Sequence, residues 1–349
     1  MLLTSLVWPR PAWKSRTVDR ALFSTFLCCG LLLLPLRVEG VQTQELQRRT
    51  LTHDGRDRVY FVHFPGNQPP AAPKPTLLVL HGGGGASAAE MARRTGMNRI
   101  ADREGFVVVY PAGVNGVWND GRGASFRRAR GNADVDDVGF IRRLIATLTE
   151  RGEADPARVY VMGASNGGMM AYRLGIELGD QLAAIAAVIA NLPVNLAHRK
   201  PVRPLPVLIM NGTDDPMMPW NGGPVRVWGR EFGTVLSTER TVRYWTDAAH
   251  LPPGPTAPRV LEEGPRDDGC RVEVEVYREE GNPAEVILYR IRGGGHNLPG
   301  GDTPDRPLLL GRKCTDINAA EVIWAFFRQH ALPHTPGVRT NTLGPPAGR

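Results

Sequence analysis

One short stretch, residues 158–170 (RVYVMGASNGGMM), constrains the fold of this chain more than any other. An apolar run that we expect to form a buried strand leads into Gly163-Ala164-Ser165-Asn166-Gly167, and helix-forming residues follow. This pattern is typical of a sharp strand-to-helix turn with Ser165 at its tip, where glycine is favoured because a β-carbon has no room. A serine hydroxyl is a weak nucleophile alone, so catalysis requires a base and an oxyanion site elsewhere in the chain. Without them, the stretch is only a glycine-rich turn.

A run of glycines offers the oxyanion site. Residues 76–80 are continuously apolar, as expected of a strand buried on both faces of a parallel sheet, and they run into His81 and four glycines. Glycines at this point allow a backbone N–H group to turn toward a reacting carbonyl, where it would act together with the N–H group of Asn166. The alternative is that the glycines form only a flexible loop.

An acid and a base follow later strands. The predicted strand 205–211 runs into Gly212-Thr213-Asp214-Asp215-Pro216, and a predicted hairpin (271–277 and 285–291) runs into three glycines and His296. Of the eight histidines, only His296 follows a last strand. The two adjacent aspartates follow the same strand, so residue types alone do not choose between them. The candidate nucleophile, acid and base therefore occur in the order Ser, Asp, His.

Strands and helices alternate along the chain, which predicts an α/β fold with a mostly parallel central sheet flanked by helices on both faces. The carboxyl ends of parallel strands meet at one edge, where the loops form the site. We expect one catalytic domain over residues 41–333. Asp134, Asp136 and Asp137 lack a calcium-loop pattern and are interpreted as helix caps, not metal ligands. The predicted strands are 58–63, 76–80, 106–110, 159–162, 184–190, 205–211, 271–277 and 285–291, and the predicted helices are 88–103, 134–151, 166–178, 234–249 and 318–330.

Residues 1–40 are predicted to be a secretory signal peptide. Four basic residues precede an apolar stretch at 21–36, and the small residue Gly40 suits a processing peptidase. The stretch is shorter than the roughly 20 apolar residues of a membrane span. We therefore favour a secreted or periplasmic protein, without stable membrane association after cleavage, over an uncleaved anchor. The Pro- and Gly-rich residues 334–349 are expected to be disordered.

Cleavage would leave Cys270 and Cys314 as the only cysteines. An oxidising compartment allows them to form a disulfide, and the alternative is two separate buried thiols. Lys and Arg exceed Asp and Glu by 42 − 35 = 7, of which residues 1–40 contribute 5 − 2 = 3, so about +4 remains. So mild a surplus indicates no nucleic-acid partner. The sequence does not indicate an oligomeric state.

At these motifs the sequence resembles the secreted polyhydroxybutyrate depolymerase-like and feruloyl esterase-like branch of the α/β-hydrolases, over about Val59 to His330. The order Ser, Asp, His is also that of the α/β-hydrolases. The resemblance selects Asp215 as the acid and Gly83 as an oxyanion donor. Two positions depart from the family pattern. Family members often have His where this chain has Asn211, and Trp where it has Leu298, so the resemblance leaves the shape of the pocket open. The matching motifs are residues 81–85, 135–141, 163–170, 212–215 and 293–300.

The resemblance implies a serine esterase that needs neither metal nor cofactor. His296 would deprotonate Ser165 while Asp215 orients the imidazole. The N–H groups of Gly83 and Asn166 would stabilise the oxyanion of the tetrahedral intermediate.

The expected substrate is a small-molecule or oligomeric carboxylic ester of the hydroxyalkanoate, feruloyl or acetyl-sugar type. Trp118, Trp220 and Leu298 are candidates for lining an apolar acyl pocket, although each is equally plausible as a packing residue. We see no polymer-binding module, which favours soluble or oligomeric esters over an insoluble polymer. The alternative function is a secreted, non-catalytic binding protein with an α/β-hydrolase fold.

Overall fold

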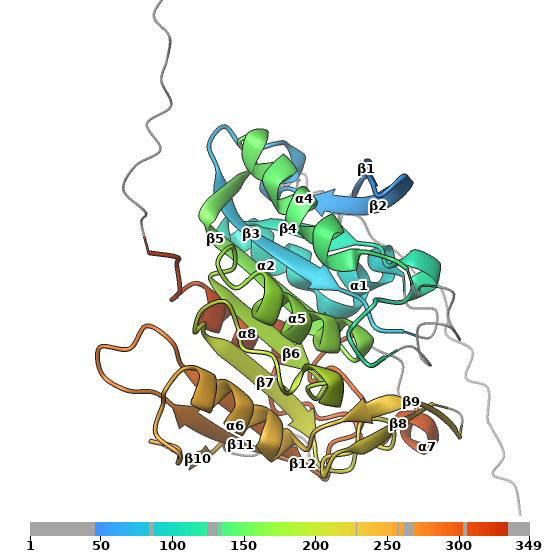
Figure 1. The fold of residues 1–349 in the computed structure, drawn as a ribbon, viewed down its shortest axis with the longest axis vertical. Coiled ribbons are helices and arrows are strands. Elements are labelled where there is room, and N and C mark those ends of the chain that lie inside the picture. Colours follow the sequence, from blue (N-terminus) through green and yellow to red (C-terminus); the bar gives the residue numbers. More distant parts are fainter. Residues whose placement is uncertain are drawn as a thin grey trace, which may run out of the picture. The chain divides into compact units, whose positions relative to one another are not determined.

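Ten strands form one central sheet in the computed structural model of the chain (Figure 1). The structure describes residues 46–83, 87–123, 132, 134–227, 229–256, 258–261, 268–302 and 306–333. These residues belong to a compact unit that begins at Gln44. The predicted signal peptide (1–40) and C-terminal tail (334–349) lie outside the described residues.

The centre of the sheet is parallel, as predicted. Its strands lie in the order β1-β2-β4-β3-β5-β6-β7-β12-β11-β10, and the pairs from β4 to β12 are all parallel. The pairs at both edges are antiparallel. The strands are β1 (Gln47–His53), β2 (Arg56–His63), β3 (Lys74–Leu80), β4 (Val107–Pro111), β5 (Ala154–Ala164), β6 (Ala184–Val188), β7 (Val207–Gly212), β10 (Arg259–Val260), β11 (Arg271–Tyr277) and β12 (Val286–Arg292), with β8 (Gly223–Val227) and β9 (Arg230–Val235) forming a separate hairpin.

Helices cover both faces of the sheet, and each face has its own apolar core (Figure 1). One core includes α4 (Asp137–Glu150), α5 (Asn166–Glu177) and α6 (Thr238–Ala248). The other includes α1 (Ala88–Thr95), α2 (Met97–Glu104) and α8 (Ala319–Phe327). Strand β3 lies between the two cores, which explains why its residues are continuously apolar. Leu78 and Leu80 pack in the first core, and Leu77 and Val79 pack in the second.

Several predicted boundaries are wrong for local reasons. The predicted helix 88–103 is broken at Gly96, whose φ of 65° lies in the left-handed region that glycine adopts easily. The predicted helix 234–249 begins only at Thr238, because the side chain of Ser237 caps it by accepting a hydrogen bond from the N–H of Arg240. The residues before this cap form β9.

Some short elements were not predicted at all. Strand β1 lies at the edge of the sheet and is only half-buried, so it lacks the apolar run that marks the central strands. The hairpin β8–β9 and the short strand β10 were also missed, as was the one-turn helix α7 (Pro307–Leu310). Among the described residues, no helix combines the length and the apolar character needed to cross a bilayer.

The aspartates before α4 have different roles. Asp136 caps the helix, because its side chain accepts a hydrogen bond from the N–H of Gly139 at 2.8 Å. Asp137 is fully buried and forms an ion pair with Arg58 at 2.6 Å, while burial raises the pKa of its carboxyl group. The cap interpretation is therefore confirmed for Asp136, whereas Asp137 joins the helix to strand β2.

Candidate active site

Ser165 lies at the turn between β5 and α5. Its backbone has φ 55° and ψ −119°, a conformation that residues other than glycine rarely adopt. Its N–H group donates to the carbonyl oxygen of Val188 at the end of β6, at 3.0 Å. A β-carbon on Gly163 would lie only 2.1 Å from the carbonyl oxygen of Gly167, so the close approach of strand and helix requires glycine there. The turn presents Ser165, which is partly exposed, at the carboxyl end of β5.

The glycines after β3 pack directly against this turn. A β-carbon on Gly82 would lie 3.5 Å from the β-carbon of Ser165. One on Gly83 would lie 3.7 Å from the β-carbon of Asn166. The structure therefore brings the two predicted oxyanion donors, Gly83 and Asn166, next to each other. The remaining glycines of the run, 84–85, lie outside the described residues.

His81 and Trp118 hold the glycine loop in place. The indole N–H of Trp118 donates to the carbonyl oxygen of His81 at 2.9 Å, and the backbone N–H of Gly113 donates to Nε2 of His81 at 2.9 Å. Because Nε2 accepts, Nδ1 carries the proton and donates to the carbonyl oxygen of Gly82 at 2.7 Å. Burial lowers the pKa of His81 and so favours this neutral form. His81 is thus a structural residue of the loop.

The predicted acid and base are in contact. The Nδ1 atom of His296 lies 2.7 Å from Oδ2 of Asp215. The other carboxylate oxygen of Asp215 accepts hydrogen bonds from the N–H groups of Met217 and Met218, both at 2.8 Å. Since an ionised carboxylate only accepts hydrogen bonds, Nδ1 carries the proton and Nε2 keeps its lone pair. Asp214 is exposed, and its carboxylate accepts a hydrogen bond from the preceding threonine hydroxyl.

Close backbone packing brings these two loops together. A β-carbon on Gly212 would lie 2.1 Å from the carbonyl oxygen of Gly294, and one on Gly295 would lie 2.1 Å from the carbonyl oxygen of Leu310. Beyond the glycines, the backbone N–H of His296 donates to the carbonyl oxygen of Leu310 at 2.5 Å. The glycines before the histidine therefore let the loop fit between β7 and the segment that begins at residue 310.

All three predicted triad residues lie at the same edge of the sheet. Ser165 follows β5, Asp215 follows β7 and His296 follows β12. The strands β5, β6, β7 and β12 are consecutive neighbours and run parallel, so their carboxyl ends point the same way. This edge is the usual position of the site in an open α/β sheet.

A buried polar network that the sequence reasoning missed surrounds Asn166. The side-chain oxygen of Asn166 accepts from the N–H of Trp118 at 2.7 Å, and its amide nitrogen donates to Oδ2 of Asp120 at 2.5 Å. Asp120 is fully buried and pairs with Arg122 at 2.8 Å. Arg122 donates in turn to the carbonyl oxygen of Phe232 at 3.0 Å. The opposite charges two residues apart in a glycine-rich loop were the only sequence signal for this network.

The candidate pocket residues have different environments. Trp118 is 0% exposed and Leu298 is 4% exposed, and each packs within an apolar core, which favours the packing alternative for both over lining a pocket. Their apolar surface is used for packing, and Trp118 also anchors the glycine loop. Trp220 is partly exposed; the guanidinium of Arg290 lies 4.6 Å from its ring centre, and its indole N–H donates to Glu239. Of the three, only Trp220 has surface to offer a ligand.

Asn211 occupies one of the two positions that depart from the family pattern. It is buried, and its side-chain oxygen accepts a hydrogen bond from the N–H of Ala190 at 2.9 Å. Its amide nitrogen donates to the carbonyl oxygen of Ala190 and to the side chains of Asn191 and Thr238. The amide thus joins the ends of β6 and β7 to the start of α6, and its role in the structure is packing rather than ligand contact.

The sheet order, the two helical layers and the serine turn define the class of protein, which is the α/β-hydrolases. Solved structures agree with this fold. An acetyl xylan esterase from Aspergillus awamori aligns with a TM-score of 0.51 and 14% identity, over 73% of this chain and 95% of that one. A protein described as a dipeptidyl aminopeptidase IV from Bacteroides ovatus aligns with a TM-score of 0.51 and 17% identity, over 84% of this chain and 36% of that one.

Residues 61–200 match the family described as Esterase PHB depolymerase. The chain is 35% identical over 298 residues to the "Putative esterase NocK" of Nocardia uniformis subsp. tsuyamanensis. The aligned region covers 82% of this chain and 84% of that protein. The chain belongs to this esterase family and is a carboxylic ester hydrolase, which confirms the resemblance inferred from its motifs. It is also 28% identical to a feruloyl esterase B of Piromyces equi over 68% of this chain, but spans only 42% of that longer protein.

Proposed function

We propose that this chain is an exported serine esterase that uses Ser165, His296 and Asp215 as a catalytic triad. The observation that carries the proposal is the 2.7 Å contact between His296 Nδ1 and Asp215 Oδ2, at the sheet edge where the strained turn presents Ser165. A carboxylate at Nδ1 leaves the Nε2 lone pair available to take a proton from a hydroxyl group.

In the proposed mechanism, Nε2 of His296 removes the proton of Ser165 as the hydroxyl oxygen attacks the ester carbonyl. Asp215 keeps the imidazole oriented and stabilises its protonated form. The N–H groups of Gly83 and Asn166 donate hydrogen bonds to the oxyanion that develops on the carbonyl oxygen. His296 then gives the proton to the departing alcohol, and water repeats the sequence to release the acid. Every step uses groups of this chain, the ester and water.

We further propose a soluble or oligomeric ester of the feruloyl, acetyl-sugar or hydroxyalkanoate type as the substrate. The support comes from relatives that are named for such esters, the feruloyl esterase B and an acetylxylan esterase of Coprinopsis cinerea that is 31% identical over 36% of this chain. The partly exposed Trp220, which follows the Asp215 loop, is the candidate contact for an acyl or sugar ring.

One experiment tests these points together. The protein is collected from the exported fraction, its first residue is read by N-terminal sequencing, and turnover is measured on aryl, feruloyl, acetyl-sugar and hydroxybutyrate esters. We expect an N-terminus near Val41, turnover of at least one ester, and stoichiometric labelling of Ser165 by a serine-directed phosphonate. A folded protein that turns over none of these esters, or that is labelled at another residue, would instead indicate a binding protein or a different nucleophile.

The Asp120–Arg122 pair leads to a second prediction about the same site. Asp120 fixes the side chain of Asn166, whose backbone N–H is a proposed oxyanion donor. Asp120→Asn removes the charge that balances Arg122 in a buried place, so we expect a loss of roughly 3 kcal/mol in stability. Because an oxyanion donor acts mainly in the transition state, we also expect kcat to fall roughly 10- to 100-fold with little change in KM.

A matched control separates stability from catalysis in this experiment. Arg49 and Glu153 form another ion pair that is largely buried, at 2.8 Å between β1 and the start of β5. Glu153→Gln should lower the melting temperature without lowering kcat. Steady-state kinetics and melting curves of both variants are the measurements; equal effects of the two substitutions on kcat would show that Asp120 acts only through general stability.

A further inference from the structure

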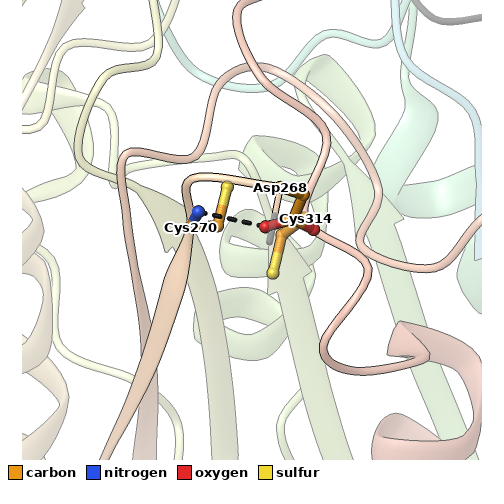
Figure 2. Close-up of side chains that lie close together, drawn as sticks. All are labelled: Asp268, Cys270 and Cys314. Atoms are coloured by element: carbon orange, nitrogen blue, oxygen red, sulfur yellow. Dashed lines mark hydrogen bonds between the residues drawn. The ribbon is translucent and has the colours of Figure 1, made fainter. Parts of the chain in front are cut away.

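Two cysteines far apart in the sequence meet beside the loop that carries His296. Cys270 directly precedes β11, and Cys314 lies between α7 and α8. Both side chains are buried, and their sulfur atoms lie within 4.8 Å of each other and of a carboxylate oxygen of Asp268 (Figure 2). The fold therefore makes neighbours of two thiols that are 44 residues apart in the sequence.

A single carboxylate holds the two cysteine-bearing segments together. One oxygen of Asp268 accepts from the backbone N–H of Cys270 at 3.0 Å, as the dashed line in Figure 2 shows. The other accepts from the backbone N–H and the hydroxyl of Thr315, at 2.6 and 2.7 Å. Because Thr315 directly follows Cys314, this clamp fixes both cysteine backbones before any bond forms between the sulfurs.

The segment that contains Cys314 supports the histidine loop. The N–H of Gly295 donates to the carbonyl oxygen of Arg312 at 2.9 Å, and the N–H of Gly300 donates to the carbonyl oxygen of Cys314 at 3.0 Å. The side-chain amide of Asn297 also donates to the carbonyl oxygen of Arg312, at 3.2 Å. The position of residues 310–314 therefore determines where His296 lies.

We propose that Cys270 and Cys314 are a thiol–disulfide site, and that the disulfide fastens the support of His296 to the start of strand β11. The bond would close a loop of 314 − 270 = 44 residues. It would join the segment under the histidine loop to β11, which pairs along its whole length with β12, the strand that leads into His296. Both attachments of the loop would then be covalently linked.

The oxidant in this step is an external low-molecular-weight disulfide, RSSR. The thiolate of Cys314 attacks one sulfur of RSSR, and the first thiolate RS⁻ leaves. The thiolate of Cys270 then attacks Sγ of Cys314, and the second RS⁻ leaves. The two cysteine thiols lose two electrons and two protons in total, and RSSR becomes two RSH. This order is consistent with the effect of each thiol on the other, which lowers the pKa of Cys314 and, together with burial, raises the pKa of Cys270.

The same three side chains could instead bind a metal ion, but their contacts favour the disulfide. Both carboxylate oxygens of Asp268 already accept hydrogen bonds, three in total, from Cys270 and Thr315. A structural zinc site needs four ligands, and the cluster offers one aspartate and two cysteines. Zinc retention is therefore the competing outcome in the experiment below.

The test uses the full chain with the substitutions Cys28→Ser and Cys29→Ser, so that Cys270 and Cys314 are its only cysteines. It compares this protein after incubation with oxidised glutathione and after reduction with dithiothreitol. In the oxidised sample we expect an intact mass lower by two hydrogens, no thiol titratable after denaturation, and a disulfide-linked peptide pair that contains both cysteines. Reduction should lower the melting temperature by about 5 to 10 °C. One further expectation rests on the proposed function: reduction should lower kcat roughly tenfold, because the segment that supports His296 becomes less rigid.

Controls keep the outcomes distinct. In Cys270→Ser and Cys314→Ser, dithiothreitol should change neither the melting temperature nor kcat. Two titratable thiols in the oxidised protein that keeps only Cys270 and Cys314 would overturn the inference, and so would one equivalent of tightly held zinc that is lost in Cys314→Ser. A disulfide that forms without any effect on the melting temperature would also contradict it. Thiol titration, mass and melting do not depend on ester hydrolysis, so failure of the proposed function would be recognised separately.

Discussion

Ser165→Ala should reduce kcat for an activated ester by on the order of 10⁴-fold or more, and His296→Ala should reduce it nearly as much. In the proposed triad the hydroxyl group and the imidazole act as one unit, so the nucleophile without its base is as ineffective as the base without its nucleophile. The double variant should therefore be little worse than either single variant. The measurement is kcat under saturating ester, with melting curves to show that each variant is folded.

The matched control for the histidine is His198→Ala. His198 is exposed, and its neighbour Arg199 pairs with Glu177 at the end of α5 that is opposite to Ser165. Its replacement should leave kcat within about twofold of the wild-type value, since surface substitutions away from special features have small effects. If the losses at Ser165 and His296 multiplied in the double variant, the two side chains would be acting independently, which would contradict the triad.

Asp215→Asn should lower kcat by roughly 10⁴-fold while the fold is retained. An amide at this position can still accept the hydrogen bonds of Met217 and Met218, which hold the turn, but its neutral side chain cannot stabilise a protonated His296. It also permits the wrong tautomer, in which the imidazole proton lies on Nε2, so that no lone pair remains there to accept a proton.

The neighbouring aspartate provides the control for this substitution. Asp214 is exposed and accepts a hydrogen bond from the hydroxyl of Thr213 at 2.7 Å. Asp214→Asn preserves the shape and should change kcat by no more than a few-fold. The two variants differ by one position in the same turn, so kcat and melting temperature measured side by side separate the acid from its neighbour. Equal losses, or a larger loss at Asp214, would reverse the assignment.

The parts of the fold that follow from local chemistry were predictable. Continuous apolar runs predicted the buried central strands, and the glycines around Ser165 predicted the turn, because each signal depends on neighbours in the sequence. The break at Gly96 and the late start of α6 at Thr238 depend on a single backbone conformation or cap, which a pattern of apolar residues does not reveal. The hairpin β8–β9 was missed because β8 has no apolar run: Val225 is its only buried residue.

The candidate site was also predictable only where the signal lies in neighbouring residues of the sequence. His296 could be identified because it follows a glycine run after a strand, but residue types could not choose between two adjacent aspartates. That choice depends on how the turn directs each carboxylate, and the family resemblance supplied it. For Trp118 the sequence left pocket lining and packing equally plausible, because a tryptophan in a glycine-rich loop can face either solvent or core. Its indole N–H donates a hydrogen bond to the carbonyl oxygen of His81, and this contact between residues distant in the sequence fixes its position.

The backbone conformation of Ser165 lowers the stability of the fold at the residue that is the proposed nucleophile. A positive φ with an extended negative ψ costs a residue with a β-carbon on the order of 1 to 3 kcal/mol, and the packing of β5 and α5 around it must offset that cost. A population selected only for resistance to heat would therefore be expected to lose the serine, and glycine would be its natural replacement. A serine in so unfavourable a conformation is therefore what the proposed catalytic role would require: the chemistry of its hydroxyl group outweighs a loss of stability at this position.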